Sequence, residues 1–346
     1  MARRGGSLTV VSVAYPFATV TADPVGGAEQ VLAHIDRALV AAGHRSIVIA
    51  PEGSRVAGEL DAVPAATEAI DDDVRERIHR AVRAHLRDAI AYERPHVVHV
   101  HGIDFAAYLP PPGPPVLATL HLPLDWYPAE ALAPTRPGTW LHPVSAHQAR
   151  IAPAGATLGP PIENGVDLEV VPAMKRGFAL ALGRVCAEKG IDDAIDAARR
   201  ASTPLLIAGT IFPYAEHRRY FAECVSPRLD GSRRWIGSVE GRRKMRLLAQ
   251  ARCVLVASKA RETSSLVAME AIAAGTPVVA YRAGALPEIV EHGRTGFIVD
   301  DVGAMAAAIA EVDRIDSDEC RRRARERFPV ERMTRAYLDR YRELAR

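Results

Sequence analysis

The fold is decided by residues 253–281, CVLVASKARETSSLVAMEAIAAGTPVVAY. The stretch begins with a short apolar run, passes through a polar loop into a helix of small residues, and ends in a second apolar run at 277–281. A strand, a helix and a strand in this order predict a parallel pair joined by a right-handed crossover. Glu262 and Glu270 are eight positions apart. That is not the one-turn spacing of neighbours on a helix, so the bend from loop to helix must place them.

The same alternation runs through the rest of the chain. Apolar runs that we interpret as strands, separated by longer helical stretches, occur at 8–14, 46–50, 96–100, 115–120, 139–145, 178–184, 204–209, 233–237, 253–258, 277–281 and 296–300. A length of 346 residues fits two domains. We therefore predict an α/β protein with two doubly wound parallel-sheet domains, in which ligands bind beyond the carboxyl ends of the strands.

The segment 159–177 is rich in turn residues and is the predicted linker. We accordingly place the first domain at 1–168, the second at 169–328, and a basic C-terminal helix at 329–346. Residues 1–168 carry 13 Arg and no Lys against 18 acids, a net charge of −5, whereas 169–346 carry 31 Lys and Arg against 24 acids, a net charge of +7. This asymmetry favours an anionic ligand, such as a phosphate, on the second domain, although scattered basic helices would produce the same pattern.

The cysteine pattern indicates reduced thiols. No C-x-x-C pair and no His at ligand spacing accompany the four cysteines, which are Cys186, Cys224, Cys253 and Cys320. We therefore expect a cytoplasmic protein without structural zinc. Tyr15 and Pro16 interrupt the first apolar run, so we interpret it as a strand and not as a signal peptide. No stretch approaches the ~20 apolar residues of a membrane span.

Charged and flexible residues follow several predicted strands. Gly26 and Gly27 open the first helix, where they form either a tight turn or an anion-binding loop. Arg184 and Lys189 follow the strand at 178–184. Two cations at a strand end can neutralise a diphosphate, and the alternative is a pair of solvated surface cations.

The loop that contains Glu262 leads into the helix that contains Glu270. Ser264 or Ser265 is the expected N-cap of that helix. Carboxylates accept hydrogen bonds from vicinal hydroxyls, so a sugar or a ribose is a natural partner for each acid. The alternative is an exposed loop acid and a helix acid that stabilises its own dipole.

Histidines follow two strands of the first domain. His101 and His121 come after their strands, where they could donate hydrogen bonds or carry protons near pH 7, while His99 belongs to the strand itself. The polar and aromatic residues Asp125, Trp126 and Tyr127 come next and suit sugars, lipids and polyketides alike. The acids at 71–73 indicate a helix start and not a metal site.

Six motifs, taken in order, resemble those of glycosyltransferase family 4, the retaining nucleotide-sugar transferases with the GT-B fold. They are GGAE (26–29), HVH (99–101), NGVD (164–167), GRVCAEKG (183–190), ETSSLVAME (262–270) and GTPVVAYRAGALPEIVEHGRTGF (275–297). The resemblance implies two Rossmann-like domains that face each other across a cleft, with the acceptor bound by the first and the donor by the second. It also implies that the last helix crosses back to the first domain, and that catalysis needs no metal and no cofactor beyond a UDP- or GDP-sugar donor.

The resemblance also implies residue roles. Glu262 would bind hydroxyls of the transferred sugar, Glu270 the ribose, and Arg184 with Lys189 the diphosphate. Gly26 and Gly27 would close over the donor, His121 would lie near the anomeric centre, and backbone groups at Val239 would hold the base. The remaining donor-binding positions would be Thr263, Ser264, Ser265, Leu266 and Val267. Many family members have Phe-Gly where this chain has Ser264 and Ser265, which leaves the identity of the sugar open.

The expected function is transfer of a hexose, with retention of configuration, to a hydroxyl of a small-molecule, glycan or lipid-linked acceptor. The acceptor-side candidates are His101, Asp125, Trp126 and Tyr127. Two alternatives stay open: a UDP-N-acetylhexosamine 2-epimerase on the same fold, and a non-catalytic nucleotide-sugar-binding protein. No nucleic-acid partner is expected. The basic C-terminal helices leave peripheral contact with the inner membrane face as an alternative to a purely cytoplasmic protein.

Overall fold

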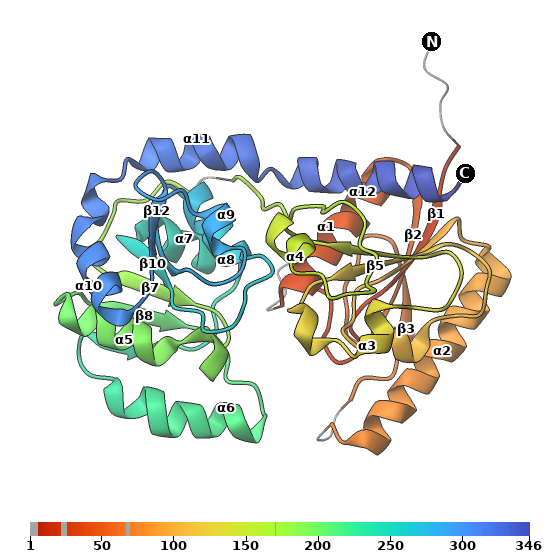
Figure 1. Ribbon diagram of the computed structural model, residues 1–346, viewed down its shortest axis with the longest axis horizontal. Coiled ribbons are helices and arrows are strands. Elements are labelled where there is room, and N and C mark those ends of the chain that lie inside the picture. The colour runs from red at the N-terminus through yellow and green to blue at the C-terminus, as the bar shows by residue number, and fades with distance from the viewer. Residues whose placement is uncertain (1–5, 22–25, 67–69, 170) are drawn as a thin grey trace, which may run out of the picture. The chain divides into compact units, whose positions relative to one another are not determined.

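A computed structural model of the chain describes residues 6–21, 26–66, 70–169 and 171–346. The chain forms two compact units: unit 1 comprises Met1–Glu163 and Glu331–Arg346, and unit 2 comprises Asn164–Val330. Each unit contains a six-stranded sheet with helices packed on it (Figure 1). Because every pair of neighbouring strands is parallel, the predicted class of two doubly wound α/β sheets is confirmed.

The sheet of unit 1 has the strand order β3-β2-β1-β4-β5-β6. Its strands are β1 (Thr9–Val13), β2 (Arg45–Pro51), β3 (Glu59–Val63), β4 (Val97–Val100), β5 (Val116–Leu120) and β6 (Thr139–Pro143). The sequence prediction missed β3. This edge strand buries only Val63 fully, so it lacks the continuous apolar run by which the other strands were recognised.

The described helices of unit 1 are α1 (Gly27–Ala41), α2 (Asp72–Glu93), α3 (Ala129–Leu132), α4 (Ala146–Arg150) and α12 (Val330–Leu344), whose first residue still belongs to unit 2. The side chain of Asp71 caps α2 by accepting a hydrogen bond from the Val74 N–H at 2.9 Å. This cap explains the run of acids at 71–73 as a helix start. α12 packs on the sheet of unit 1 through two buried tyrosines, Tyr337 and Tyr341.

The sheet of unit 2 has the order β12-β11-β10-β7-β8-β9. Its strands are β7 (Ala179–Leu182), β8 (Leu205–Ala208), β9 (Arg233–Trp235), β10 (Cys253–Val256), β11 (Val278–Tyr281) and β12 (Gly296–Val299). The described helices are α5 (Ile191–Arg200), α6 (Ala215–Tyr220), α7 (Gly241–Gln250), α8 (Leu266–Ala273), α9 (Leu286–Ile289), α10 (Val302–Glu311) and α11 (Ser317–Arg327). Apolar cores lie on both faces of the sheet, which explains why its strands are almost continuously apolar.

Segment 159–177 is attached to both units and is not a free linker. Its first part bonds to unit 1, where the Gly159 N–H donates to the Leu141 carbonyl at 2.8 Å. Its middle bonds within unit 2, where the Val166 N–H donates to the Phe328 carbonyl at 2.9 Å. The chain therefore passes from one unit to the other within the predicted segment, at residues 163–164.

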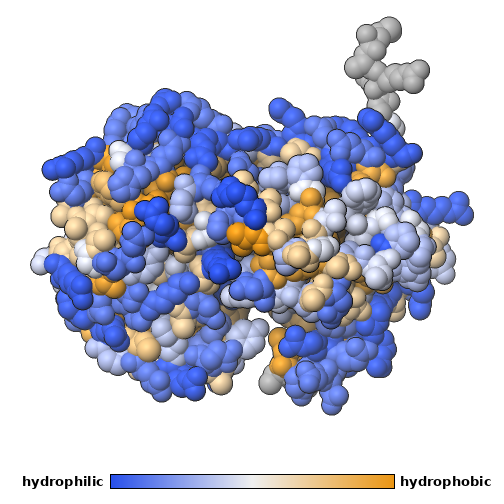
Figure 2. Space-filling model, in the orientation of Figure 1, coloured by the Kyte–Doolittle hydropathy of each residue, from blue (hydrophilic) through white to orange (hydrophobic). Residues whose placement is uncertain are grey.

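The arginines of α11 and α12 are largely balanced by acids. The ion pairs on these helices include Arg321–Asp318, Arg322–Glu319, Arg323–Glu291, Arg340–Glu343 and Arg342–Asp339. Figure 2 shows mostly hydrophilic residues over each helix. Within the described ranges, no helix combines the length and the apolar character that crossing a bilayer requires.

Both sheets share one topological feature that positions ligands. The strand order reverses direction between β1 and β4 in unit 1, and between β7 and β10 in unit 2. In doubly wound sheets, ligands bind beyond the carboxyl ends of the strands at this reversal. The loops that follow β1, β4, β7 and β10 are therefore the segments in which functional residues are expected.

Candidate functional site

Unit 2 joins a lysine and a glutamate at its strand-order reversal. Lys189 lies in the loop after β7 and Glu262 in the loop after β10, and Lys189 Nζ is 2.5 Å from Glu262 Oε1. Their side chains are 30% and 11% exposed. The two loops on either side of the reversal are thus linked by a partly buried ion pair, a contact that the sequence analysis did not predict.

Gly190 allows the two loops to come this close. It has φ +58°, and a Cβ at this position would lie 2.0 Å from the Ala257 carbonyl oxygen. The neighbouring Glu188 carbonyl accepts hydrogen bonds from the Lys259 N–H at 2.8 Å and from the Ser258 hydroxyl at 3.1 Å. Because a residue with a side chain would push the loops apart, Gly190 helps to fix Lys189 opposite Glu262.

The helix after Glu262 begins at a serine cap. Of the two candidate serines, Ser265 is the N-cap of α8, and its hydroxyl accepts a hydrogen bond from the Ala268 N–H at 3.3 Å. The Ser264 hydroxyl is buried and has no hydrogen-bond partner among the described residues. Thr263 is buried, whereas Leu266 and Val267 are half-buried. The loop therefore presents one buried hydroxyl that makes no hydrogen bond within the described ranges.

Glu270 pairs with a lysine that the sequence did not single out. Lys244 of α7 places its Nζ 3.2 Å from Glu270 Oε1, and the side chains are 13% and 6% exposed. Lys244 was missed because it lies among arginines in GRRKMR, and nothing in that run distinguishes the half-buried lysine from the exposed arginines. Glu262 and Glu270 thus have different lysine partners, which is inconsistent with a carboxylate pair that shares one proton.

Two other predicted donor-binding residues of unit 2, Arg184 and Val239, differ in whether the side chain or the backbone could contact a ligand. Arg184 is half-buried, and its guanidinium makes no ion pair or hydrogen bond with the described residues. Its N–H groups are therefore available to an anion. Val239 buries its side chain in the core, so a contact with a ligand would come from its backbone.

In unit 1, the predicted histidines lie together. His101 Nδ1 is 3.0 Å from His121 Nε2, and the two rings stack with their centroids 5.3 Å apart. His99 bonds to Thr119 and to Tyr341 of α12, at 2.7 and 2.6 Å. His101 Nε2 is buried and has no hydrogen-bond partner in the described part of the chain. The strand ends thus carry a histidine cluster in which His99 and His101 are buried and His121 is half-buried.

Burial sets the charge of this cluster. Loss of water, together with the nearby His142, lowers the pKa of His121 to about 3, and burial also holds the pKa of His101 well below its usual value. Both rings are therefore neutral at pH 7. Neutral rings suit the predicted role of hydrogen-bond donors better than that of proton carriers, and both roles stay predictions.

The acceptor-side candidates separate into exposed and buried residues. Asp125 is exposed and Trp126 is 40% exposed. Tyr127 is buried against Phe105, and its hydroxyl accepts a hydrogen bond from the Leu122 N–H at 3.3 Å. The prediction that Tyr127 faces an acceptor is therefore corrected, because its ring belongs to the core.

The glycines at the start of α1 lie beside an acid. Gly26 is the N-cap of α1, and a Cβ there would lie 1.8 Å from Glu29 Oε2. Glu29 is buried in the first turn, so its carboxylate already interacts with the positive end of the helix. Gly27 is exposed. Residues 22–25 of the same loop lie outside the described residues, and closure of this loop over a donor stays a prediction.

Comparisons with known proteins agree with this arrangement. Residues 25–155 match the family model "Glycosyltransferase Family 4", and residues 176–313 match "Glycosyl transferases group 1". The chain is 33% identical over 164 residues to a glycogen synthase of Mycobacterium tuberculosis. That match covers 44% of this chain and 39% of the relative, so the chain spans about two fifths of the relative's length.

Two solved structures match almost the whole chain. AviGT4, a glycosyltransferase involved in avilamycin A biosynthesis, is 26% identical with a TM-score of 0.75, and 98% of each chain is covered. HepE from Anabaena, in complex with UDP-glucose, is 16% identical with a TM-score of 0.75, over 96% of this chain and 99% of HepE. These likenesses confirm the GT-B fold. Two glycosyltransferase family models thus match consecutive parts of the chain, the family 4 model residues 25–155 and the group 1 model residues 176–313.

Proposed function

We propose that the protein transfers a hexose from a nucleoside-diphosphate sugar to an acceptor hydroxyl with retention of configuration. The observation that carries this proposal is the pair of separate Lys–Glu contacts at the strand-order reversal of unit 2. Two carboxylates with different partners suit two separate sets of hydroxyls, those of the sugar at Glu262 and those of the ribose at Glu270. Arg184 and Lys189 then hold the diphosphate.

Donor binding requires Lys189 to change partners. In the donor-free chain its ammonium group neutralises Glu262, and both groups would otherwise be partly buried charges. A diphosphate offers Lys189 a new anion, and the sugar hydroxyls offer Glu262 new hydrogen-bond donors. Donor binding thus replaces the Lys189–Glu262 pair by two contacts, one from Lys189 to the diphosphate and one from Glu262 to the sugar.

The transfer breaks the bond between the anomeric carbon and the diphosphate oxygen and forms a bond from the acceptor oxygen to the same face of that carbon. Negative charge builds on the departing phosphate, where Arg184, Lys189 and the first N–H groups of α8 stabilise it. The departing phosphate takes the acceptor proton. Since these groups supply the positive charge, we propose that the transfer needs no divalent metal and no further cofactor.

Unit 1 supplies the acceptor side in this proposal. Neutral His121 donates a hydrogen bond near the anomeric centre, and His101, its partner at 3.0 Å, orients the ring. The exposed Asp125 and Trp126 contact a small-molecule, glycan or lipid-linked acceptor. We further propose that the protein works in the cytoplasm on acceptors that it meets in solution or at the membrane surface.

A donor screen followed by a turnover assay tests the proposal. Thermal shifts are measured with UDP-, GDP- and ADP-sugars, starting with UDP-glucose because HepE was solved with it. NMR of the product then gives the anomeric configuration, and an inverted product refutes retention. Arg184→Ala and Lys189→Ala are each expected to lower turnover by about 100-fold or more. The control Arg200→Ala removes an exposed cation at the last residue of α5, the end of that helix that is farther along the chain from Lys189, and should leave the rate unchanged.

The same assays separate the two alternatives. Conversion of a UDP-N-acetylhexosamine without any acceptor would identify an epimerase. Thermal stabilisation by a nucleotide sugar, with neither transfer over a broad acceptor panel nor slow donor hydrolysis, would identify a binding protein.

A further inference from the structure

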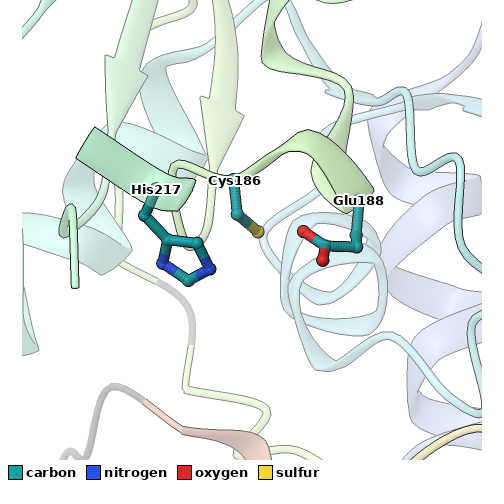
Figure 3. Close-up of side chains that lie close together, drawn as sticks. All are labelled: Cys186, Glu188 and His217. Atoms are coloured by element: carbon teal, nitrogen blue, oxygen red, sulfur yellow. The ribbon is translucent and has the colours of Figure 1, made fainter. Parts of the chain in front are cut away.

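A cluster of three potential metal ligands lies outside the contacts assigned to the donor. Cys186 Sγ, a carboxylate oxygen of Glu188 and a ring nitrogen of His217 all lie within 4.8 Å of one another. Cys186 and His217 are buried, and Glu188 is half-buried. Figure 3 shows the sulfur atom between the imidazole ring and the carboxylate. Three side chains of different chemistry therefore converge on one point.

The sheet topology brings these residues together. Cys186 follows β7, His217 lies on α6 after β8, and β7 and β8 are parallel neighbours. The two loops are joined by hydrogen bonds from the Gly183 N–H to the Ala208 carbonyl and from the Val185 N–H to the Thr210 carbonyl, both 3.0 Å long. Spacing along the chain does not reveal this group, because only the sheet brings Cys186 and His217 together.

The imidazole of His217 is held in place by its surroundings. His217 is 7% exposed, and its Nδ1 is buried without a hydrogen-bond partner in the described part of the chain. The ring is held edge-on against Tyr214, with centroids 5.2 Å apart. Figure 3 shows the other ring nitrogen, Nε2, on the side of the sulfur atom, so the ring can reach an ion at the cluster through Nε2.

We propose that Cys186, Glu188 and His217 bind a zinc ion. Thiolate, imidazole and carboxylate are the ligands that Zn²⁺ takes in proteins, and three protein ligands leave the fourth tetrahedral position to water. Mg²⁺ and Ca²⁺ are disfavoured because they prefer oxygen ligands. Zinc ligands lie about 3.5 Å apart in a tetrahedron. Contraction of the cluster by about 1 Å, chiefly through rotation of the half-buried Glu188, therefore forms the site.

Coordination also defines what the ion does. The ligand is the thiolate, so binding breaks the S–H bond of Cys186, forms a Zn–S bond and releases the proton to solvent. The ion then links the segment after β8 to the loop that carries Arg184 and Lys189. This link is structural. It takes no part in the transfer, and its test does not depend on the proposed donor.

Zinc binding is measured on the full chain after treatment with a chelator. The chain is titrated with ZnCl₂ against a chromophoric chelator, and with CoCl₂ to detect a thiolate-to-cobalt charge-transfer band. We expect one metal ion per chain and a clear charge-transfer band. Cys186→Ser and His217→Gln should each weaken zinc binding by about 100-fold or more, because even partners outside the ligand shell change affinity 10- to 100-fold. Cys186→Ser should also abolish the band.

Cys224→Ser is the matched control, because Cys224 is a partly exposed free cysteine just after α6 that does not belong to the cluster. It should keep both the affinity and the band. Absence of the band in the original chain, or equal zinc binding in the original chain and both ligand variants, would overturn the proposal. If Cys186→Ser and His217→Gln do not fold, zinc binding by Glu188→Gln is the decisive measurement. This variant keeps the backbone carbonyl that anchors the loop and should still lose at least about tenfold in zinc affinity, and unchanged affinity there refutes the site.

Discussion

In the donor-free chain Lys189 pairs with Glu262, so Glu262 competes with the diphosphate of the donor for Lys189. The side chains are 30% and 11% exposed, so the pair is intermediate between an exposed and a buried ion pair. Exposed pairs contribute less than about 1 kcal/mol, and breaking a buried pair costs about 3–5 kcal/mol. We therefore expect a coupling free energy of about 1–3 kcal/mol between the two residues. A diphosphate that takes Lys189 from Glu262 must overcome this coupling.

Glu262→Gln removes the competing charge and keeps the shape of the side chain. UDP has no sugar for Glu262 to hold, so the variant should bind UDP about 5- to 150-fold more tightly, the factor that 1–3 kcal/mol represents. The full sugar nucleotide should instead turn over about 10- to 100-fold more slowly, because its hydroxyls lose a charged acceptor. One substitution thus moves nucleotide affinity and turnover in opposite directions.

Calorimetric titration of UDP into four proteins checks this reasoning. They are the original chain, Glu262→Gln, Lys189→Met and the double variant, with GDP replacing UDP if the donor screen selects it. Without Lys189 no cation is released, so Glu262→Gln should then change nucleotide affinity by less than about twofold. If Glu262→Gln weakens nucleotide binding, or strengthens it equally in the Lys189→Met background, the proposal that Lys189 moves from Glu262 to the diphosphate is refuted.

Three further outcomes are expected. The pKa values of His121 and His142 are lowered by burial to about 3 and about 4. Stability from these rings is therefore present above pH 6.5 and lost as the pH falls below it, by about 1.4 kcal/mol per pH unit for each ring, and urea unfolding at pH 7 and pH 5.5 measures the loss. Ser265→Ala should cost about 1 kcal/mol through loss of the cap of α8, whereas Ser264→Ala removes a hydroxyl without a protein partner and should leave the melting temperature unchanged. Since the arginines of α11 and α12 are largely paired with acids, the protein should not float with phosphatidylserine liposomes at physiological salt, and flotation would restore the membrane-contact alternative.

The sequence carried enough information for the strands that lie between two helical layers. Such strands are apolar on both faces, and runs such as 253–258 stand out for that reason. β3 lies at the edge of its sheet and leaves Leu60 exposed, so its composition does not differ from that of a loop. The sequence also placed Lys189 and Glu262 after strands, but only the strand order of the structure, with β7 beside β10, makes them neighbours.

Contacts between side chains of separate elements were not predictable in the same way. Lys244 is one of four cations in six residues, and only the packing of α7 on α8 shows which of them reaches Glu270. Cys186 and His217 belong to neighbouring strand ends, a relation that sequence spacing does not express. Tyr127 follows an exposed tryptophan, and the turn that directs one ring outward and the next into the core has no sequence signature of its own.

The position of β7 within its sheet explains why one short loop serves two purposes. β7 has β10 on one side and β8 on the other. The loop after β7 therefore reaches Glu262 beyond β10 through Lys189, and His217 beyond β8 through Cys186. Cys186 is the N-cap of the 3-10 turn Ala187–Lys189, and Lys189 is the last residue of that turn. A zinc ion that fixes Cys186 would thus hold one end of this turn. Lys189, at the other end, must release Glu262 when the donor binds, so a change at either site would reach the other through the backbone of the turn.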